Sequence, residues 1–218
     1  MEKREVLFTN KDLKKLIIPL IIEQLLTVTV GLADSIMISS VGEAAVSGVS
    51  LVDSIMILLI NMFSALATGG AVVAGQYLGQ KKHVMACKTA DQLILFISAL
   101  ALVIMAGIYA MRGFILHGVF GAIEPAVMHS AEVYLLIVTA SIPFLAVYNG
   151  CAALFRTMGN SKTAMQMSLF MNAINIIGNA ALIYGVGMGV EGAAIPTLVS
   201  RVIAAAVILV LLKNRNQA

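Results

Sequence analysis

Long apolar stretches alternate with short polar breaks along the chain. A helix that crosses the hydrocarbon core of a bilayer needs about 20 consecutive apolar residues. Six segments meet this length, at residues 16–39, 48–78, 90–111, 131–154, 164–184 and 191–212. The breaks between them carry the glycines and charged residues that favour turns. The pattern therefore predicts an all-α integral membrane fold, with residues 1–218 forming a single bundle of six transmembrane helices.

Two features suggest that these helices are not all straight. The segment 48–78 is longer than one span needs and contains the glycines of "ATGGAVVAGQYLG", so we expect a tilted or bent helix there. Pro19, Pro143 and Pro196 lie inside or near spans, where proline removes a backbone hydrogen bond and favours a kink.

The composition agrees with a membrane protein. The chain is 60% hydrophobic and 11% charged, against about 25% charged residues in a typical soluble domain. Its first apolar run follows the charged lead "MEKREVLFTNKDLKK" and is too long for a cleavable signal peptide, so we expect it to stay as the first span. No soluble domain is visible between the spans.

Basic residues indicate how the bundle is oriented. Lysine and arginine favour the cytoplasmic side of a membrane, and twelve of them lie at the ends or in every second loop, against Arg112 alone in the other loops. The bias predicts that both termini are cytoplasmic, in a multi-pass protein of a prokaryotic plasma (inner) membrane. The remaining basic residue, Arg201, falls inside the sixth segment.

Polar residues inside the apolar segments follow a helical pattern. Two helix faces carry them at spacings of three and four residues: Ser168, Asn172, Asn175 and Asn179 on the fifth segment, and Gln24, Thr27, Gly31 and Asp34 on the first. Asp34 and Asn179 lie five residues from the outer ends of their segments, Thr197 lies six residues in, and Asp53 about five. These side chains therefore share one depth, and the two polar faces can meet inside the bundle.

The chemistry of this set favours a cation site. Carboxylate, amide and hydroxyl oxygens suit Na⁺, and the acid can equally hold a proton. In the alternative, the asparagines only hydrogen-bond across helices and stabilise packing. Asp34 favours the cation site, because packing does not require a charge and an ionisable group in the membrane is costly. Burial favours its protonated form and the amides favour its charged form, which leaves Na⁺ and H⁺ both open.

Two stretches of the chain resemble a known family. The run "FRTMGNSKTAMQMSLFMNAINIIGNAALIYGVGMGVEGAAIPTLVSR" is similar to the fifth and sixth helices of the multidrug and toxic compound extrusion (MATE) transporters, and "IPLIIEQLLTVTVGLADSIMISSVGEAAVSGVSLVD" to their first helix and the start of the second. The resemblance implies that Asp34 corresponds to the aspartate of the cation site in the N-terminal lobe. It also matches Asn175 and Asn179 to the asparagine pair of the fifth helix, and Thr197 to a nearby hydroxyl, and so implies a Na⁺ or H⁺ site formed by these four residues.

The family pattern has twelve helices in two lobes, and this chain covers one lobe of six. Two parallel copies would reproduce the two-lobe arrangement, because six spans bring both ends to the same side. The sequence therefore predicts either a homodimer of half-transporters or an isolated N-terminal lobe without transport activity of its own. In the homodimer, the substrate path would be a V-shaped cavity lined mainly by the first, second and fourth helices.

The resemblance implies multidrug efflux, in which small amphipathic organic cations leave in exchange for Na⁺ or H⁺. A flippase of the same superfamily is a weaker alternative, because its cavity would be rich in basic residues and this chain offers only Arg201. The sequence "MGNSKT" lacks the G-x-x-x-x-G-K-[ST] spacing of a phosphate-binding loop, so we expect no ATP hydrolysis, no enzyme activity and no cofactor besides the coupling ion. The expected partners are membrane lipids and a second copy or second lobe, and no nucleic acid.

Further polar residues are accessory candidates for the cavity: Gln24, Asp53, Asn61, Asn172 and Arg201. For Arg201 we weigh a role as counter-ion of Asp34 against a side chain that reaches toward a polar loop, and the second is slightly favoured. Glu23 is expected either to pair with a neighbour or to line an inward-facing cavity.

Overall fold

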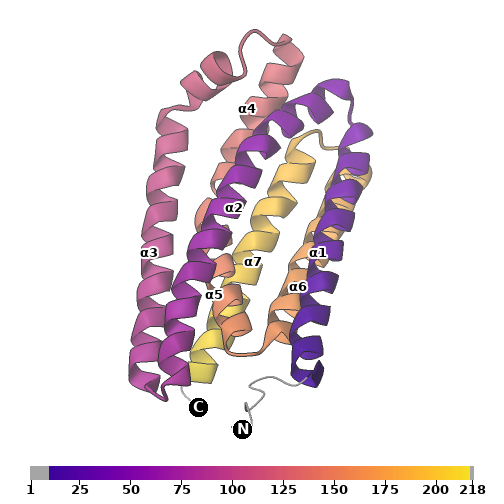
Figure 1. Ribbon diagram of the computed structural model, residues 1–218. Helices are drawn as coiled ribbons and strands as arrows, with labels where there is room; N and C mark the ends of the chain where they lie inside the picture. Colours follow the sequence, from indigo (N-terminus) through magenta and orange to yellow (C-terminus); the bar gives the residue numbers. More distant parts are fainter. Residues whose placement is uncertain (1–9, 217–218) are drawn as a thin grey trace.

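The computed structural model describes residues 10–216, and within this range every regular element is a helix (Figure 1). The elements are α1 (Asn10–Ser39), α2 (Glu43–Gly79), α3 (His83–Ala110), η1 (Phe114–Val119), α4 (Pro125–Thr139), α5 (Ile142–Thr157), α6 (Ser161–Ala180), η2 (Ala181–Gly185) and α7 (Glu191–Asn216), where η marks a π-helix. The prediction of an all-α fold is confirmed.

The predicted spans correspond to helices that are long and apolar enough to cross a membrane. Within residues 10–216, five helices are long and apolar enough on their own, and α4 and α5 together form one further span bent by 50°. The bend falls inside the segment 131–154, which the sequence predicted as a single helix. Pro143 lies in the first turn of α5, where its missing N–H costs no helical hydrogen bond. The kink expected near Pro143 is therefore present, and it divides the span into two helices.

The second span is one unbroken helix of 37 residues, α2. It begins at Glu43, five residues before the predicted start, directly after Gly42 with its positive φ of 138°. Figure 1 shows α2 running obliquely across the bundle, as its excess length requires. The glycine-rich stretch near its end does not interrupt the helix.

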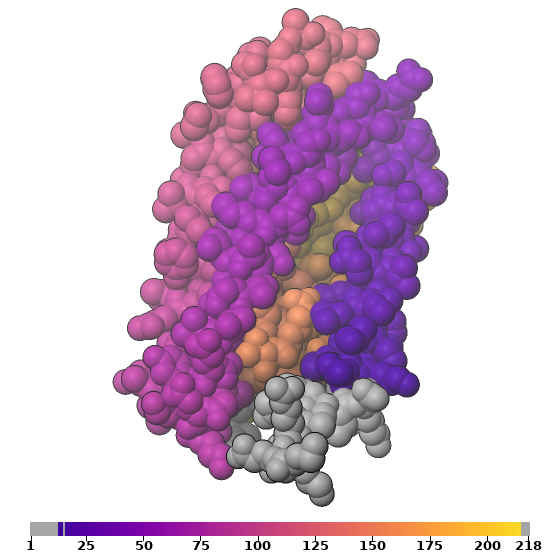
Figure 2. All heavy atoms as spheres, viewed as in Figure 1, coloured from indigo at the N-terminus to yellow at the C-terminus, as the bar shows by residue number. Residues whose placement is uncertain are grey.

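The packing separates α1 from the rest of the bundle. α2 packs against α3, α4 and α5, whereas α1 packs mainly against α6, which in turn packs against α7. The largest fully buried side chains include Phe63, Ile97, Leu135, Phe155 and Ile208, from five helices of one continuous core. Figure 2 shows a groove between α1 and α2, with atoms of later helices at its floor. This groove leaves one side of each of these two helices uncovered.

The start of α1 and the end of α7 lie at the same end of the bundle (Figure 1). An even number of spans requires this arrangement. Residues 1–9, which contribute Lys3 and Arg4 to the charge bias, and residues 217–218 lie outside the described residues. That this end is cytoplasmic stays a prediction, and below it is called the inner end and the opposite one the outer end.

Candidate functional site

The polar faces of α1 and α6 meet in the outer half of the bundle. Asn179 donates a hydrogen bond from Nδ2 to Oδ1 of Asp34 at 2.8 Å. Asn179 is only 1% exposed, while Asp34 is half-buried. An amide N–H directed at a carboxylate stabilises its charged form, so the helices hold the acid of α1 against a donor of α6.

Asn175, one turn from Asn179, connects Asp34 to Thr197 of α7. With its amide nitrogen toward the acid, Nδ2 lies 3.2 Å from each oxygen of Asp34, and its Oδ1 lies 3.0 Å from the hydroxyl of Thr197. With the amide turned over, its oxygen would face both carboxylate oxygens, a repulsive arrangement unless a proton or cation lies between them. Four residues predicted from the sequence are therefore joined in one network: Asp34, Asn175, Asn179 and Thr197.

A close approach of α6 and α7 positions this network. Gly178 lies beside Pro196, and a Cβ atom placed on Gly178 would be 2.6 Å from Cβ of the proline. Only glycine fits such a contact, and the contact places the neighbouring Asn179 and Thr197 on facing helices. Directly after α6 the chain forms the π-helix η2, a type of turn that is frequent at functional sites.

A small cavity of about 90 Å³ adjoins the network. Its polar lining comes from α1, α2, α4, α6 and α7 and comprises Asp34, Ser35, Ser50, Asp53, Tyr134, Asn179 and Thr197. Oδ1 of Asn179 is buried and accepts no hydrogen bond within the described part of the chain. The volume has room for a cation with a few waters, and the lining offers it oxygen ligands.

Asp53 faces the same cavity from α2. Its Oδ1 accepts a hydrogen bond from the hydroxyl of Tyr134 on α4 at 3.2 Å. The sequence placed Asp53 at the right depth but did not identify Tyr134, which is only 6% exposed. A buried tyrosine hydroxyl usually requires a partner, so a tyrosine in an apolar span next to a predicted intramembrane acid was the available signal.

Arg201 lies inside the bundle, which corrects the slightly favoured expectation that it reaches toward a loop. Its Nη1 donates to Oγ of Ser141 at 2.7 Å, and Ser141 donates in turn to the carbonyl of Val138 at 2.6 Å. Ser141 lies at the break between α4 and α5, where its hydroxyl oxygen accepts the hydrogen bond from the guanidinium. Among the described residues, no carboxylate lies within ion-pair distance of Arg201.

Three accessory candidates do not join the network. Gln24 on α1 and Asn61 on α2 are exposed, and Asn172 on α6 is half-buried. None of the three lines the small cavity, and within residues 10–216 none has a side-chain hydrogen bond. The helical spacing alone could not separate Asn172 from Asn175 and Asn179.

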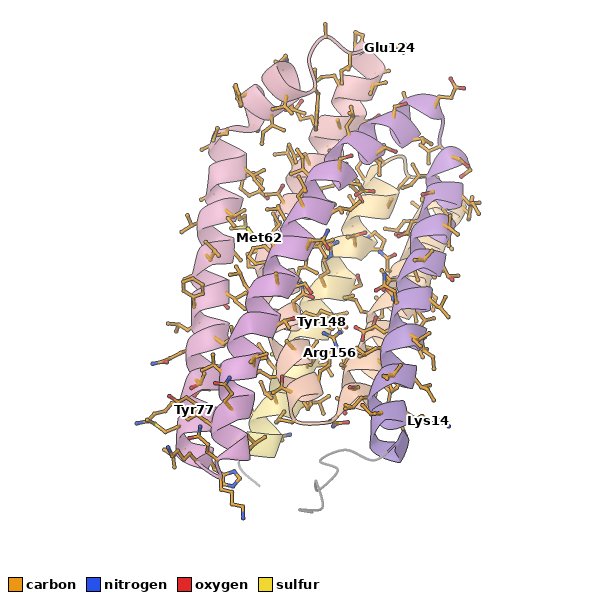
Figure 3. All side chains as sticks on the ribbon, viewed as in Figure 1. Lys14, Met62, Tyr77, Glu124, Tyr148 and Arg156 are labelled. Atoms are coloured by element: carbon orange, nitrogen blue, oxygen red, sulfur yellow. The ribbon has the colours of Figure 1, made fainter. Side chains whose placement is uncertain are left out.

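A second polar contact lies in the inner half of the bundle. Arg156, in the last turn of α5, forms an ion pair with Glu23 of α1 at 2.5 Å. Figure 3 shows Arg156 in the half that carries the chain ends. Of the two alternatives for Glu23, the structure shows pairing. The sequence reading missed the partner because it counted Arg156 only as a loop charge for orientation.

A helical membrane bundle with ionisable groups in its apolar interior is the architecture of proteins that move ions or solutes across membranes. Comparison with known proteins identifies the family. The MatE family model matches residues 19–181, and the chain belongs to this family.

Individual relatives support this assignment. The chain is 30% identical over 203 residues to the uncharacterized transporter YisQ of Bacillus subtilis, covering 91% of this chain and 44% of the relative. It is 25% identical over 221 residues to the probable multidrug resistance protein NorM of Thermotoga maritima, covering 100% and 47%. Among solved structures, a MOP superfamily transporter from Pyrococcus furiosus has the same fold, with a TM-score of 0.87 at 24% identity, covering 94% of this chain and 45% of that one. The chain thus spans about half the length of the relatives it matches.

Proposed function

We propose that the chain forms one lobe of a secondary transporter that exports amphipathic organic cations in exchange for Na⁺ or H⁺. The observation that carries this proposal is Asp34, an ionisable group in a membrane span, held by two asparagine amides beside a small cavity. Relatives named as multidrug resistance proteins support the export of organic compounds. An ion gradient supplies the energy in this proposal.

The polar network gives a physical basis for coupling. An ion can drive a conformational change only if it binds one conformation better than the other. Asp34 and Asn179 lie on α1 and α6, so a movement of α1 would separate the acid from its donor and change the affinity for a cation. Rotation of the Asn175 amide by 180° would exchange a donor that stabilises the carboxylate for an oxygen that coordinates a cation. Occupancy of the site and the position of α1 would then be linked.

The uncovered sides of α1 and α2 support a second lobe. Asn61 lies at the middle of α2, and its exposed carboxamide cannot satisfy itself within the helix as a serine or threonine hydroxyl can. A lipid-facing amide at the centre of the bilayer would be unfavourable. We therefore infer that Asn61 and Gln24 face a hydrated cavity. A second six-helix lobe closes this cavity, and in a homodimer that lobe is a second, parallel copy of the chain.

Transport by the purified chain in vesicles tests the proposed function. Ethidium, an organic cation, should accumulate when a Na⁺ or a pH gradient is imposed, and Asp34→Asn should abolish the response to either gradient. The matched control is Asp91→Asn, because Asp91 is an exposed aspartate on α3, remote from the network. Unchanged dependence on the ion gradient in Asp34→Asn would assign the asparagines to packing alone.

Cysteine accessibility tests the second lobe. In a variant with both native cysteines replaced by serine, a cysteine at Asn61 should react with a water-soluble maleimide and should cross-link two copies in membranes. A cysteine at Leu95, which is 74% exposed on α3, is the lipid-facing control and should do neither. Persistent failure to cross-link at Asn61 and Gln24 in a folded protein would favour the isolated lobe.

A further inference from the structure

The small cavity of the outer half contains more charge than the Asp34 network alone explains. Asp34 on α1 and Asp53 on α2 both line it, and Arg201, one turn from the lining residue Thr197 on α7, holds its guanidinium inside the bundle against Ser141. Two acids and one guanidinium leave a net charge of about −1 when all three are ionised. On α6 the residue that lines the cavity is the neutral Asn179. The second acid of the cavity therefore comes from α2.

Two hydroxyl groups of the lining, those of Ser35 and Thr197, direct their hydrogens away from the cavity. The hydroxyl of Ser35 donates to the carbonyl of Gly31 at 2.9 Å. Thr197 donates its one hydrogen either to the carbonyl of Ala193 at 2.9 Å or to the amide oxygen of Asn175. Their lone pairs are therefore left for the cavity.

Two further hydrogen-bonding groups of the lining, those of Tyr134 and Asn179, show the same pattern. Tyr134 donates its hydrogen to Oδ1 of Asp53, and Oδ1 of Asn179 is a buried acceptor with no donor among the described residues. A proton needs one base, whereas a shell of acceptor oxygens around a cavity of about 90 Å³ suits a metal cation.

We propose that Asp53 is a direct ligand of the coupling cation, opposite Asp34, and that Arg201 offsets one of the two acids, so that the lobe takes a single monovalent cation, Na⁺. Because Asp53 and Asp34 lie on helices that otherwise contact each other little, the bound ion draws α2 toward α1. Occupancy of the site is thereby linked to the width of the groove between these helices.

The position of Arg201 fits this role. The hydrogen bond to Ser141 holds the guanidinium at the break between α4 and α5, away from ion-pair contact with either acid. Ser141 follows the C-terminal end of α4 by two residues, and the carbonyl end of a helix favours a nearby cation. Arg201 therefore lowers the negative charge of the site without occupying the place of the ion.

This inference rests on the proposed function and extends it to the identity and number of the ions. Its test is the equilibrium binding of ²²Na⁺ to the purified chain in detergent, without a substrate or a gradient. Asp53→Asn should weaken Na⁺ binding at least tenfold, roughly as expected for one lost charge near the ion. Asp34→Asn should weaken it further, and Asp91→Asn, the exposed control, should change it less than twofold.

Arg201→Gln tests whether Arg201 offsets the charge of one acid. The expected result is a gain in Na⁺ affinity, which a misfolded protein could not produce. Glutamine keeps a donor for Ser141 and removes the charge, so Na⁺ should bind about tenfold more tightly. Ca²⁺ should then displace ²²Na⁺ from this variant but not from the wild type. Arg201→Lys, which keeps the charge, should restore the wild-type affinity and the wild-type preference for Na⁺ over Ca²⁺.

Three results would overturn the inference. Na⁺ binding within twofold of wild type in both Asp53→Asn and Arg201→Gln, with binding lost in Asp34→Asn, would remove Asp53 and Arg201 from the site and leave the proposed function standing. A wild type that binds no ²²Na⁺ would exclude the Na⁺ site, while a pH-driven transport assay would still support export. Equal binding by Asp34→Asn and wild type would remove the site on which both proposals depend.

Discussion

Two polar regions of the bundle involve the same helix, α1, but they are built differently. In the outer half, Asp34 contacts only neutral donors and borders a cavity. In the inner half, Glu23 contacts the guanidinium of Arg156 directly, and Oε2 of Glu23 and Nε of Arg156 are buried without a hydrogen-bond partner in the described chain. The outer acid thus has room for an exogenous cation, whereas the inner acid already has one from the protein.

The outer region can therefore bind an ion, whereas the inner region attaches α1 to the rest of the bundle. α1 packs mainly against α6, so the inner ion pair is a specific link from its inner half to α5. Removing a charge from the outer region should change ion dependence with little change in stability. Removing a charge from the inner region should lower stability and leave ion dependence intact.

Drug resistance in cells should show the largest difference between variants of the outer region and variants of the inner region. Expression of the wild-type chain should raise the ethidium concentration needed to stop growth, and Asp34→Asn should eliminate this protection because it removes the charge and keeps the shape. Glu23→Gln, the inner counterpart, should retain protection in proportion to the folded protein in the membrane. Equal loss in both variants, at equal protein levels, would show that the two regions do not have separate roles.

Thermal unfolding in detergent should show the reverse contrast. Glu23→Gln leaves Arg156 half-buried without its counter-ion and should cost about 1–3 kcal/mol, less than a fully buried pair because both side chains are partly exposed. Replacing both residues with glutamine should recover part of this loss, because no charge is then left unpaired. A double variant less stable than Glu23→Gln would contradict this account.

The contact between Gly178 and Pro196 offers an intermediate effect. Gly178→Ala introduces a methyl group 2.6 Å from the proline and should push α6 away from α7, at a cost of about 1–3 kcal/mol. Because Asn179 follows directly, the separation should also weaken ion-dependent transport. Gly107→Ala on α3, where the added atom meets nothing within 4 Å, is the matched control and should leave transport unchanged.

The asparagines of α6 should show the smallest effects, and these should be graded. Asn179→Ala removes the donor to Asp34 and should reduce ion-driven transport about tenfold, in line with the loss of one charge-assisted hydrogen bond. Asn172→Ala should change the rate less than twofold, because Asn172 has no contact with the network. Initial rates of gradient-driven ethidium uptake measure both, and a larger effect at Asn172 would reverse the assignment.

The sequence predicted the spans and the depth of the polar residues because both follow from one helix at a time. Apolar length defined the spans, and helical spacing placed Asp34, Asn175, Asn179 and Thr197 at one level, where the structure joins them. Contacts between helices were not available in the same way. The bond from Tyr134 to Asp53 and the pair of Glu23 with Arg156 join residues 81 and 133 positions apart.

Arg201 shows the same limit more sharply. The expectation that Arg201 reaches a loop rests on side-chain length alone, which takes no account of partners inside the bundle. The break at Ser141 creates such a partner. Pro143 indicated the bend of 50° at this break, but not that a side chain of α7 would contact it. Tertiary contacts of a buried charge therefore decide its place, more than its own chemistry does.

Coupling at the outer region is the central proposal, and ion movement driven by substrate tests it directly. Vesicles with the purified chain, no initial ion gradient and an imposed ethidium gradient should move Na⁺ or H⁺ in the opposite direction to ethidium, as measured by ²²Na⁺ and by a pH-sensitive dye. Glu23→Gln should retain this counter-movement and Asp34→Asn should lose it. Counter-movement that persists undiminished in Asp34→Asn would contradict the account, because the ion would then cross without the carboxylate that is proposed to bind it.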